Sequence, residues 1–383
     1  MRKVGINLLW MVPGVVGGSE TYMTRLLRGL AERDSGLDYT LFALPQFAEA
    51  HTDLATSFEI AYAPLSGQVK WFRVGGENTW LARQCRKRDI DLIHHGGGTM
   101  PLIRTTRSIL TIHDLQYLYY PEYFTPTKLR FLRTMVPRSA EAARVVLVPS
   151  EFTRRTVIER LSIDPSIVIV VPHGIAPREE LEVPTDVRKR YDIPGPYFLY
   201  PAATYPHKNH LTLLQGFVRL LGAHPDATLV FTGAKAWQEW SVAKEMNERI
   251  THEITKLGIQ RQVKRLGYVS SGDLNALYNE ATAMVFPSHF EGFGAPVLEA
   301  MARRCAVIAS NATALPEVVS DAGRLVSPDN AEEWAQAMAD FIENETLREG
   351  YVKAGVDRAK IFGWGQSAGI LEDAYRHALE TSL

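Results

Sequence analysis

Short apolar runs alternate with amphipathic helical segments along almost the whole chain, and this alternation restricts the fold more than any other feature. In the first half, the runs are rich in valine, isoleucine and leucine and do not alternate with polar residues, which is typical of parallel strands covered on both faces. We expect strands at residues 4–10, 39–44, 58–63, 92–95, 108–112, 145–149 and 167–171. Helical segments such as 19–33 and 151–161 separate them, the second with Ser150 as its N-cap.

The second half of the chain repeats this scheme. We expect strands at residues 197–201, 228–232, 263–266, 283–287, 306–309 and 324–326. The helices expected between and after them lie at residues 209–221, 239–257, 295–303, 331–343 and 345–361. Repeated strand–helix units of this length predict an α/β protein with two doubly wound, Rossmann-like domains.

Proline marks the expected boundary between the two domains. Five prolines and a charge cluster occupy residues 172–196, which is typical of a connection between domains. We therefore expect an N-terminal domain over residues 1–175, a linker over 176–195 and a C-terminal domain over 196–365. No strand follows the last helix, 366–383, so this helix can pack on either domain, including back on the N-terminal one.

Composition and charge exclude several classes of protein. The 383 residues have a formal net charge of −1 and 46% of them are apolar, so neither a disordered chain nor a nucleic-acid partner is expected. Cys85 and Cys305 are far apart, which provides no disulfide framework and fits the reducing cytoplasm. Asn7 and Pro13-Gly14 interrupt the first apolar run, and no run reaches the roughly 18 residues of a membrane span. We therefore expect a cytoplasmic protein.

The segment 286–300 carries the strongest functional signal. A buried strand ends at Pro287, and a loop with two glycines leads into a helix with Pro296 in its first turn, a favoured position for proline. Ligands of doubly wound domains bind at the carboxyl ends of strands, and helix starts attract phosphate, so the segment suits a diphosphate. Glu291 lies on the loop and Glu299 lies in the helix, so the two carboxylates can face different parts of one ligand.

With this segment the chain resembles the large family of retaining glycosyltransferases with the GT-B fold, commonly called family four or glycosyl transferases group 1. Glu291 and Glu299 match its Glu-x7-Glu motif. The resemblance implies two domains facing a central cleft, with Glu291 on the hydroxyls of the donor sugar and Glu299 on the ribose of the nucleotide. The helix start that it assigns to donor binding comprises Phe293, Gly294, Ala295 and Pro296. The alternative is an acidic first turn that only stabilises the helix.

Two places in the first domain extend the resemblance. Gly17 and Gly18 follow the first strand, where the family has its glycine loop, and can let the backbone approach phosphate or acceptor. A tight turn capped by Ser19 is the alternative. His113 ends a strand, where the family has a histidine beside the donor sugar, and such a histidine can donate to a sugar hydroxyl or to phosphate. Asp114 then either orients His113 or caps a helix.

The loop after the first strand of the second domain contains Lys208, which by the same resemblance reaches the donor diphosphate as a point charge. Surface solvation is the alternative for this lysine. Family members often have an arginine six residues earlier, where this chain has Ala202. His207, the helix start after Gly294, or an arginine elsewhere then has to compensate. Further donor contacts are expected at Ala203, Thr204 and Gly233. A branch that includes bacterial O-antigen mannosyltransferases is similar at residues 113–117 and 315–318.

The sequence favours no metal site. Asp89-Ile-Asp91 precedes a strand, whereas the Asp-x-Asp pattern of metal-dependent glycosyltransferases ends one. His94 and His95 are adjacent and therefore point to opposite faces of a strand. Residues 121–144 interleave basic and aromatic side chains, which fits either a weak contact with an anionic membrane surface, at its inner face, or a solvated helix.

The resemblance implies a retaining, metal-independent hexosyltransferase that moves a sugar from a nucleoside diphosphate sugar to a hydroxyl of a glycan or lipid-linked acceptor. Mannose from GDP-mannose is the first expectation, and no cofactor is expected beside the nucleotide-sugar co-substrate. Lys208 and helix-start N–H groups stabilise the departing diphosphate, while His113 and Glu291 hold the sugar. The alternatives are a UDP-hexose-dependent transferase, a nucleotide-sugar binding protein, and an epimerase or phosphorylase on the same scaffold. The residues leave open whether a donor phosphate oxygen accepts the acceptor's proton or Glu291 forms a covalent intermediate.

Overall fold

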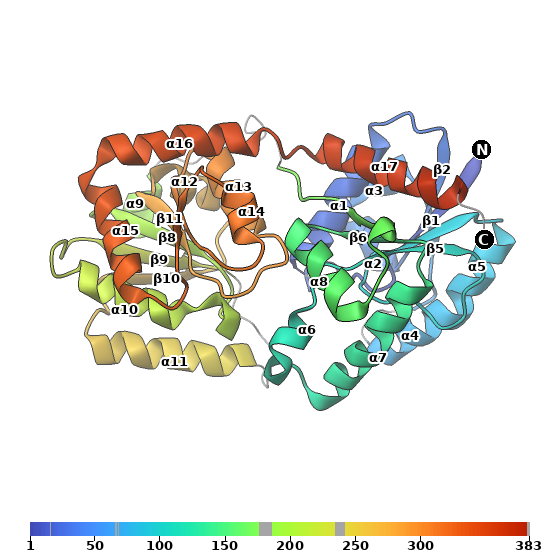
Figure 1. Cartoon of the computed structure of the whole chain (residues 1–383), viewed down its shortest axis with the longest axis horizontal. Coiled ribbons are helices and arrows are strands. Elements are labelled where there is room, and N and C mark those ends of the chain that lie inside the picture. Colours follow the sequence, from blue (N-terminus) through green and yellow to red (C-terminus); the bar gives the residue numbers. More distant parts are fainter. Residues whose placement is uncertain (16, 66, 68, 176–185, 234–241, 381–383) are drawn as a thin grey trace. The chain divides into compact units, whose positions relative to one another are not determined.

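A computed structural model of the chain describes residues 1–380 except 16, 66, 68, 176–185 and 234–241. The chain divides into two compact units (Figure 1). One unit comprises Met1–Gly174 together with Gly363–Leu383, and the other comprises Ile175–Phe362. The first half of the expected linker, 176–185, lies outside the described residues, and its second half belongs to the second unit.

The first unit contains a parallel sheet, which has seven strands in the described part of the chain and the order β3-β2-β1-β4-β5-β6-β7. Strands β4 and β6 are buried along their whole length, as expected for strands covered on both faces. The strands are β1 (Arg2–Asn7), β2 (Leu37–Ala43), β3 (Glu59–Tyr62), β4 (Leu92–His95), β5 (Arg107–Thr111), β6 (Val145–Val148) and β7 (Val168–Val170).

The helices of the first unit connect these strands and cover the sheet. They are α1 (Gly18–Ala31), α2 (Pro45–Ala50), α3 (Thr52–Ser57), α4 (Lys70–Gly76), α5 (Ala82–Lys87), α6 (Gln116–Tyr119), α7 (Pro126–Ala142), α8 (Glu151–Leu161) and α17 (Trp364–Glu380). A π-helical turn, Glu77–Leu81, joins α4 to α5. Ser150 caps α8 as predicted, because its Oγ accepts the N–H of Thr153 at 3.0 Å. The N-cap of α1 is Gly17 rather than Ser19.

The last helix, α17, packs on α1 in the first unit (Figure 1). Gly29 allows the close approach, since a Cβ atom there would lie 2.8 Å from the Cβ of Ala368. Glu372 is buried on α17, and its carboxylate pairs with Arg33 at the end of α1 at 2.7 Å. The apolar side chains of both helices join one core, so α17 stabilises this unit by removing apolar surface from water. Residues 381–383 of the expected helix lie outside the described part.

The second unit is built on the same plan. Its parallel sheet has six strands among the described residues, in the order β10-β9-β8-β11-β12-β13. Strand β8, the first in sequence, lies between β9 and β11, so the strand order reverses beside it. The strands are β8 (Tyr197–Pro201), β9 (Thr228–Thr232), β10 (Val263–Gly267), β11 (Ala283–Phe286), β12 (Val307–Ser310) and β13 (Arg324–Val326).

Among the helices of the second unit (Figure 1), α10 packs against α11 and α15, α13 packs against α14 and α16, and α9 packs against α12. They are α9 (Val187–Arg190), α10 (His210–Leu220), α11 (Val242–Leu257), α12 (Ser271–Glu280), α13 (Ala295–Ala302), α14 (Leu315–Val319), α15 (Ala331–Glu343) and α16 (Glu345–Ala359). Two parallel sheets covered by helices confirm the predicted α/β fold of two doubly wound domains. Residues 239–241, expected at the start of α11, lie outside the described part.

Candidate functional site

The loops after β8 and β11 bring a cation and a carboxylate together in the second unit. Lys208 ends a 3₁₀ turn in the first of these loops, and Glu291 lies in the second. The Nζ atom of Lys208 is 2.6 Å from Oε1 of Glu291, and the two side chains are only 17% and 13% exposed. A partly desolvated ion pair is held more strongly than one in open water, because the surrounding dielectric screens it less.

Backbone and amide hydrogen bonds tie the two loops to each other. The N–H of His289 donates to the carbonyl of His207 at 2.8 Å. The Asn209 side chain donates to the carbonyl oxygens of Pro287 at 3.2 Å and Pro328 at 2.7 Å. Asn209 has a φ of 57°, in the left-handed region that asparagine tolerates better than most residues. These bonds fix the backbone on both sides of Lys208 and so fix the position from which its side chain extends.

Two aromatic side chains, Tyr200 and Phe286, contact Lys208. The hydroxyl of Tyr200 donates to the carbonyl oxygen of Lys208. The Lys208 ammonium also lies 5.1 Å from the centre of the Phe286 ring, within the range of a cation–π interaction. The lysine is therefore positioned at its backbone and at its charged end.

Thr313 holds the backbone of Glu291. Its Oγ1 accepts the N–H of Glu291 at 3.0 Å. Thr313 also has a φ of 55°, which is an outlier for a β-branched residue and costs on the order of 1–3 kcal/mol. Strain of this kind clusters at functional sites, and here it lies at the residue that accepts the backbone N–H of Glu291. The sequence analysis did not find Thr313, because neither its conformation nor its partner can be seen in the local pattern.

The other residues predicted for donor binding at this loop begin α13. Gly294 is the N-cap with a φ of 102°, and a Cβ atom there would lie 2.5 Å from Leu315, so glycine is required. Ala295 and Pro296 form the first turn, and Glu299 lies half-buried further along the same helix. Phe293 directs its side chain into the core, where its ring lies 5.9 Å from that of Phe362. Any ligand contact of Phe293 therefore has to come from its backbone.

The predicted contacts nearer β8 and β9 surround a cavity of about 240 Å³. Thr204 and Gly233 line it, and so does Ala202, where the family often has an arginine. Gly233 has a φ of 131°, and a Cβ atom there would meet the carbonyl oxygen of Ala202 at 2.8 Å. The close approach of these two loops therefore requires glycine at position 233. Ala203 lies between Ala202 and Thr204 in the same loop and is half-buried.

Gly17 and Gly18 lie in the first unit, at the start of α1. Gly17 has a φ of 71°. Among the described residues, no atom lies within 4 Å of a Cβ atom built at Gly17 or Gly18, so the space beside both glycines is open. Glu20 closes the loop, since its Oε2 accepts the N–H of Gly14 at 2.8 Å. The loop thus presents backbone at the carboxyl end of β1.

His113 follows β5 in the first unit and contacts Gly96. Its Nε2 atom lies 3.0 Å from the carbonyl oxygen of Gly96, which can only accept, so Nε2 carries the hydrogen. Burial lowers the pKa of His113 to about 4, which keeps the ring neutral at pH 7 and leaves Nδ1 as a hydrogen-bond acceptor. In this tautomer Nδ1 can accept a hydrogen bond from a hydroxyl, whereas the expected donation to a sugar hydroxyl or to phosphate would use the hydrogen that Nε2 gives to Gly96.

Asp114 serves as a local cap. Its Oδ1 accepts the N–H of Gln116 at the start of α6, at 2.8 Å. His113 itself is surrounded by aromatic rings, with Tyr22 at 5.4 Å and Trp10 at 6.3 Å between ring centres. These rings and the hydrogen bond to Gly96 therefore restrict the orientation of the imidazole.

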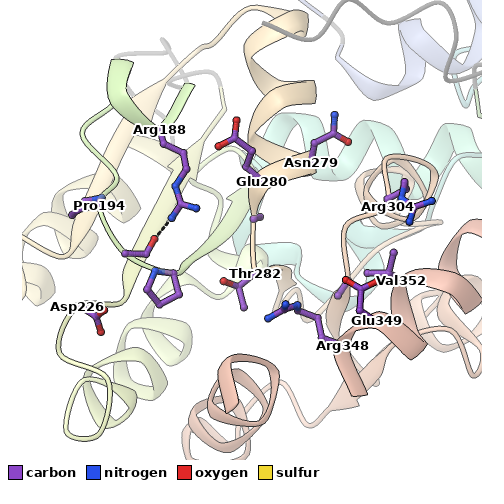
Figure 2. A pocket seen from close by; sticks show the side chains of 14 residues that line it. Arg188, Pro194, Asp226, Asn279, Glu280, Thr282, Arg304, Arg348, Glu349 and Val352 are labelled. Carbon is purple, nitrogen blue, oxygen red and sulfur yellow. Dashed lines mark hydrogen bonds between the residues drawn. The ribbon is translucent and has the colours of Figure 1, made fainter. Parts of the chain in front are cut away.

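A larger cavity of about 610 Å³ lies at the opposite edge of the second sheet, where the strands begin (Figure 2). Pro196, Thr282 and Ala306 line it, each just before the first residue of a strand. Three arginines and three carboxylates also line it, and Figure 2 shows Arg188 bound to the carbonyl of Gly195. Its charges balance, and it contains none of the predicted site residues. The candidate site is therefore at the carboxyl edge.

Residues 1–380, apart from the gaps given above, contain no group of three or more His, Cys, Asp or Glu side chains placed to hold a metal ion. In the same part of the chain, no helix combines the length and the apolar character needed to cross a membrane.

Comparison with known proteins identifies what this arrangement is similar to. Residues 186–358 match the family described as glycosyl transferases group 1, and residues 16–179 match the family described as Glycosyltransferase Family 4. The chain is 30% identical over 292 residues to the O-antigen chain mannosyltransferase B of Escherichia coli, which covers 75% of this chain and 74% of that protein.

A second relative and a solved structure agree with this match. The O-antigen chain mannosyltransferase RfbU of Salmonella typhimurium is 26% identical over 270 residues, which covers 68% of this chain and 67% of that protein. Anabaena Alr3699/HepE, solved in complex with UDP and glucose, superposes with a TM-score of 0.75 over 98% of this chain and 99% of that chain. The identity in that superposition is 18%, so it supports the fold alone.

Proposed function

The chain belongs to the glycosyl transferases group 1 family and is a hexosyltransferase that uses a nucleotide sugar, and we propose that it moves mannose from GDP-mannose to a glycan hydroxyl with retention of configuration. The O-antigen mannosyltransferases among its relatives support the choice of mannose. A lipid-linked form of the glycan acceptor is part of the proposal.

The pairing of Lys208 with Glu291 carries this proposal. In a transfer of this class, the bond between the anomeric carbon and the diphosphate oxygen breaks, and negative charge develops on the leaving diphosphate. Lys208 supplies a positive charge at a fixed position, and the N–H groups at the start of α13 supply the positive end of a helix dipole. Glu291 is within ion-pair distance of the same ammonium, so a sugar hydroxyl held by Glu291 lies close to the diphosphate site.

His113 has the role of an acceptor in this proposal. Its neutral ring, with the hydrogen on Nε2, presents Nδ1 to a hydroxyl of the sugar or of the acceptor. The proposed step forms no covalent intermediate on Glu291, so the acceptor oxygen attacks from the same face that the diphosphate leaves, and the configuration is retained. The acceptor's proton goes to a phosphate oxygen of the departing group, which balances the step without a protein base.

Weak contact of residues 121–144 with an anionic membrane surface is a second part of the proposal. These residues form a 3₁₀ turn, Pro121–Tyr123, and helix α7. Lys128, Arg130 and Arg133 lie on α7, and the Lys128 ammonium lies 5.0 Å from the ring centre of Phe124. Basic side chains next to aromatic ones suit an interface that carries a lipid-linked acceptor.

A binding screen followed by product analysis tests the proposal. The full chain is heated with GDP, UDP and ADP in turn, and we expect GDP to give the largest rise in melting temperature, since a ligand at a hundredfold excess over its Kd stabilises by roughly 2.7 kcal/mol. GDP-mannose with a mannosylated acceptor should then give a product whose anomeric proton has the α configuration of the donor. Preference for UDP would move the proposal to a UDP-hexose donor. An inverted product would exclude retention.

A further inference from the structure

Trp10 lies in the loop after β1, and the transfer proposed above gives this half-buried side chain no role. Strands β1, β4 and β5 are neighbours in the parallel sheet of the first unit, so the loops that follow them lie at the same edge. These loops carry Trp10, the glycines at positions 96–98 and His113, in that order. The backbone of Trp10 is fixed, because its carbonyl oxygen accepts a hydrogen bond from Nη1 of Arg73 at 2.8 Å.

The indole of Trp10 lies against glycine backbone. A Cβ atom built at Gly97 would lie 2.5 Å from Cγ of the indole, and one built at Gly96 would lie 3.3 Å from its Cζ2 atom. Cγ belongs to the five-membered ring and Cζ2 to the six-membered ring, so both rings of the indole lie beside this glycine segment. A side chain at position 97 would push the indole away, so the position of Trp10 requires glycine there.

The polar atom of the indole is already bound. Its Nε1–H donates to the backbone carbonyl oxygen of Asn7 at 3.0 Å. The side chain of Asn7 is buried and donates to Oε1 of Glu77 at 2.8 Å, so the residue that holds the indole is itself held. The part of the Trp10 side chain that solvent reaches is therefore carbon surface on a fixed support, which suits a ligand with an apolar face.

His113 places a hydrogen-bond acceptor beside this surface. The centres of the Trp10 and His113 rings are 6.3 Å apart, and their planes are inclined at 54°. The carbonyl oxygen of Gly96 takes the Nε2 hydrogen of His113, so Nδ1 remains as an acceptor for a hydroxyl. An anion fits these features poorly, because the face of an aromatic ring carries partial negative charge and this Nδ1 atom cannot donate. The features suit a sugar ring, which has hydroxyls at its rim and C–H groups on a face.

We propose that Trp10 is a stacking platform for the acceptor sugar, and that one hydroxyl of this sugar donates a hydrogen bond to Nδ1 of His113. This assignment rests on the proposed function and narrows it, since the acceptor then presents a pyranoside with an apolar C–H face. The donor contacts proposed above, at Lys208 and Glu291, belong to the second unit, whereas Trp10 belongs to the first. Trp10 therefore determines specificity for the acceptor and not for the donor.

Binding of simple sugars to the full chain tests the stacking platform without requiring transfer. The probes are the methyl α-pyranosides of mannose, glucose, galactose and N-acetylglucosamine. Mannitol is the matched control ligand, because it has hydroxyls but no ring face. Saturation-transfer NMR identifies the sugar protons that approach the protein, and titration gives the Kd. We expect at least one pyranoside to bind with the C–H protons of one ring face closest to the protein, and mannitol to show no saturable binding.

Three variants identify the contribution of Trp10. The pyranoside Kd should rise about tenfold in Trp10→Ala, since apolar contact of this size corresponds to about one factor of ten, and should rise less in Trp10→Phe, which keeps a smaller aromatic face. Trp80→Phe is the matched control at another half-buried tryptophan of the first unit, 6.1 Å from Phe42 between ring centres, and should leave the Kd unchanged. Trp10→Leu replaces Trp10→Ala if circular dichroism shows that the alanine variant is unfolded. An unchanged Kd in the folded variant, or no pyranoside binding to the unmodified protein, would overturn the proposal.

Steady-state kinetics separate the stacking platform from the donor site and from the proposed function. In Trp10→Ala we expect the acceptor KM to rise about tenfold and the KM for GDP-mannose to stay unchanged. An equal rise in the KM for GDP-mannose would assign the indole to the donor sugar and overturn the proposal. Pyranoside binding that depends on Trp10 in a protein that does not use GDP-mannose would support the platform and contradict the proposed donor. Transfer from GDP-mannose with an acceptor KM that is independent of Trp10 would support the proposed donor and overturn the platform.

Discussion

The Nζ atom of Lys208 lies 2.6 Å from Oε1 of Glu291, although the two residues are 83 positions apart in the sequence. Strands β8 and β11, which precede their loops, are neighbours in the sheet, and hydrogen bonds from His289 and Asn209 join the loops. The carboxylate and the cation therefore face one small volume, and we propose that the bond between the sugar and the diphosphate of the nucleotide sugar lies there.

Replacing Lys208 with alanine should lower kcat by about 10²–10³, because the cation stabilises charge that develops mainly as the diphosphate departs. Steady-state kinetics with GDP-mannose measure the effect. Lys264→Ala is the matched control, since Lys264 pairs with exposed Asp192 at 2.8 Å in the same unit. An unchanged kcat in Lys208→Ala would remove this lysine from the chemistry.

Thr313→Val should lower kcat/KM about tenfold, because valine keeps the branched shape but cannot accept the N–H of Glu291. Thr313→Ser keeps the hydroxyl and should retain most of the activity. The threonine is thus a positioning residue, and its loss should act mainly on kcat, with the melting temperature close to that of the unmodified protein. Equal activity of the valine and serine variants would contradict this role.

Six histidines make stability depend on pH. Burial is the first cause that lowers the pKa of each, to about 4 for His113 and to about 3 for the others, which are His94, His95, His173, His207 and His210. The unfolded chain binds protons below its histidine pKa of 6.5 and the folded chain does not, so the free energy of unfolding is highest above pH 6.5. It should fall by about 1.4 kcal/mol per pH unit for each such histidine as the pH drops from 6.5 toward 4.

Denaturant unfolding at a series of pH values between 7.5 and 5 measures this dependence. The upper part of the window is used because most carboxylates stay ionised there. A free energy of unfolding that stays constant from pH 7 to pH 5 would show that these rings are protonated in the folded protein.

Glu77 should have the opposite effect on stability. Burial raises the pKa of Glu77 to about 7, while the Asn7 amide donates to its Oε1 at 2.8 Å. The stability that comes from the neutral carboxyl is complete below pH 4.5 and is lost as the pH rises through 7. Glu77→Gln should therefore gain stability relative to the unmodified protein over this range, by on the order of 1–3 kcal/mol at pH 8.

The unfolding free energies of Glu77→Gln and of the unmodified protein, compared at pH 4.5 and pH 8, test this effect. Glu49→Gln, at an exposed glutamate near the end of α2, is the control and should show no pH-dependent difference. A difference between Glu77→Gln and the unmodified protein that is the same at both pH values would mean that folding does not change the pKa of Glu77.

Several elements could be predicted closely from the sequence. Helix α8 and its cap at Ser150 agree with the expectation, because capping and apolar spacing depend on residues within a few positions of one another. The expected strand 4–10 ends earlier, at Asn7. The Asn7 side chain accepts the N–H of Leu9 at 3.1 Å and lies 3.1 Å from His95, and such side-chain bonds compete with continuation of a strand.

The site could be predicted only in part. Its loops follow from local pattern, since glycine, proline and charged residues at strand ends can be recognised in the sequence. The strained Thr313 and the position of Trp10 against Gly97 could not, because a left-handed φ and a contact between loops result from packing between elements distant in sequence. The same holds for His113, whose tautomer is fixed by a carbonyl on another strand-end loop.

By itself, the sequence determined the alternation of strands and helices and the placement of Lys208 and Glu291 in loops after strands, because periodicity and turn residues act over a few neighbouring positions. Only the tertiary structure decided that these two loops meet, that α17 packs on α1, and that Trp10 lies against Gly97. The physical reason is that sheet order brings together segments far apart in the chain, and the side-chain contacts that follow depend on distances that no local pattern contains.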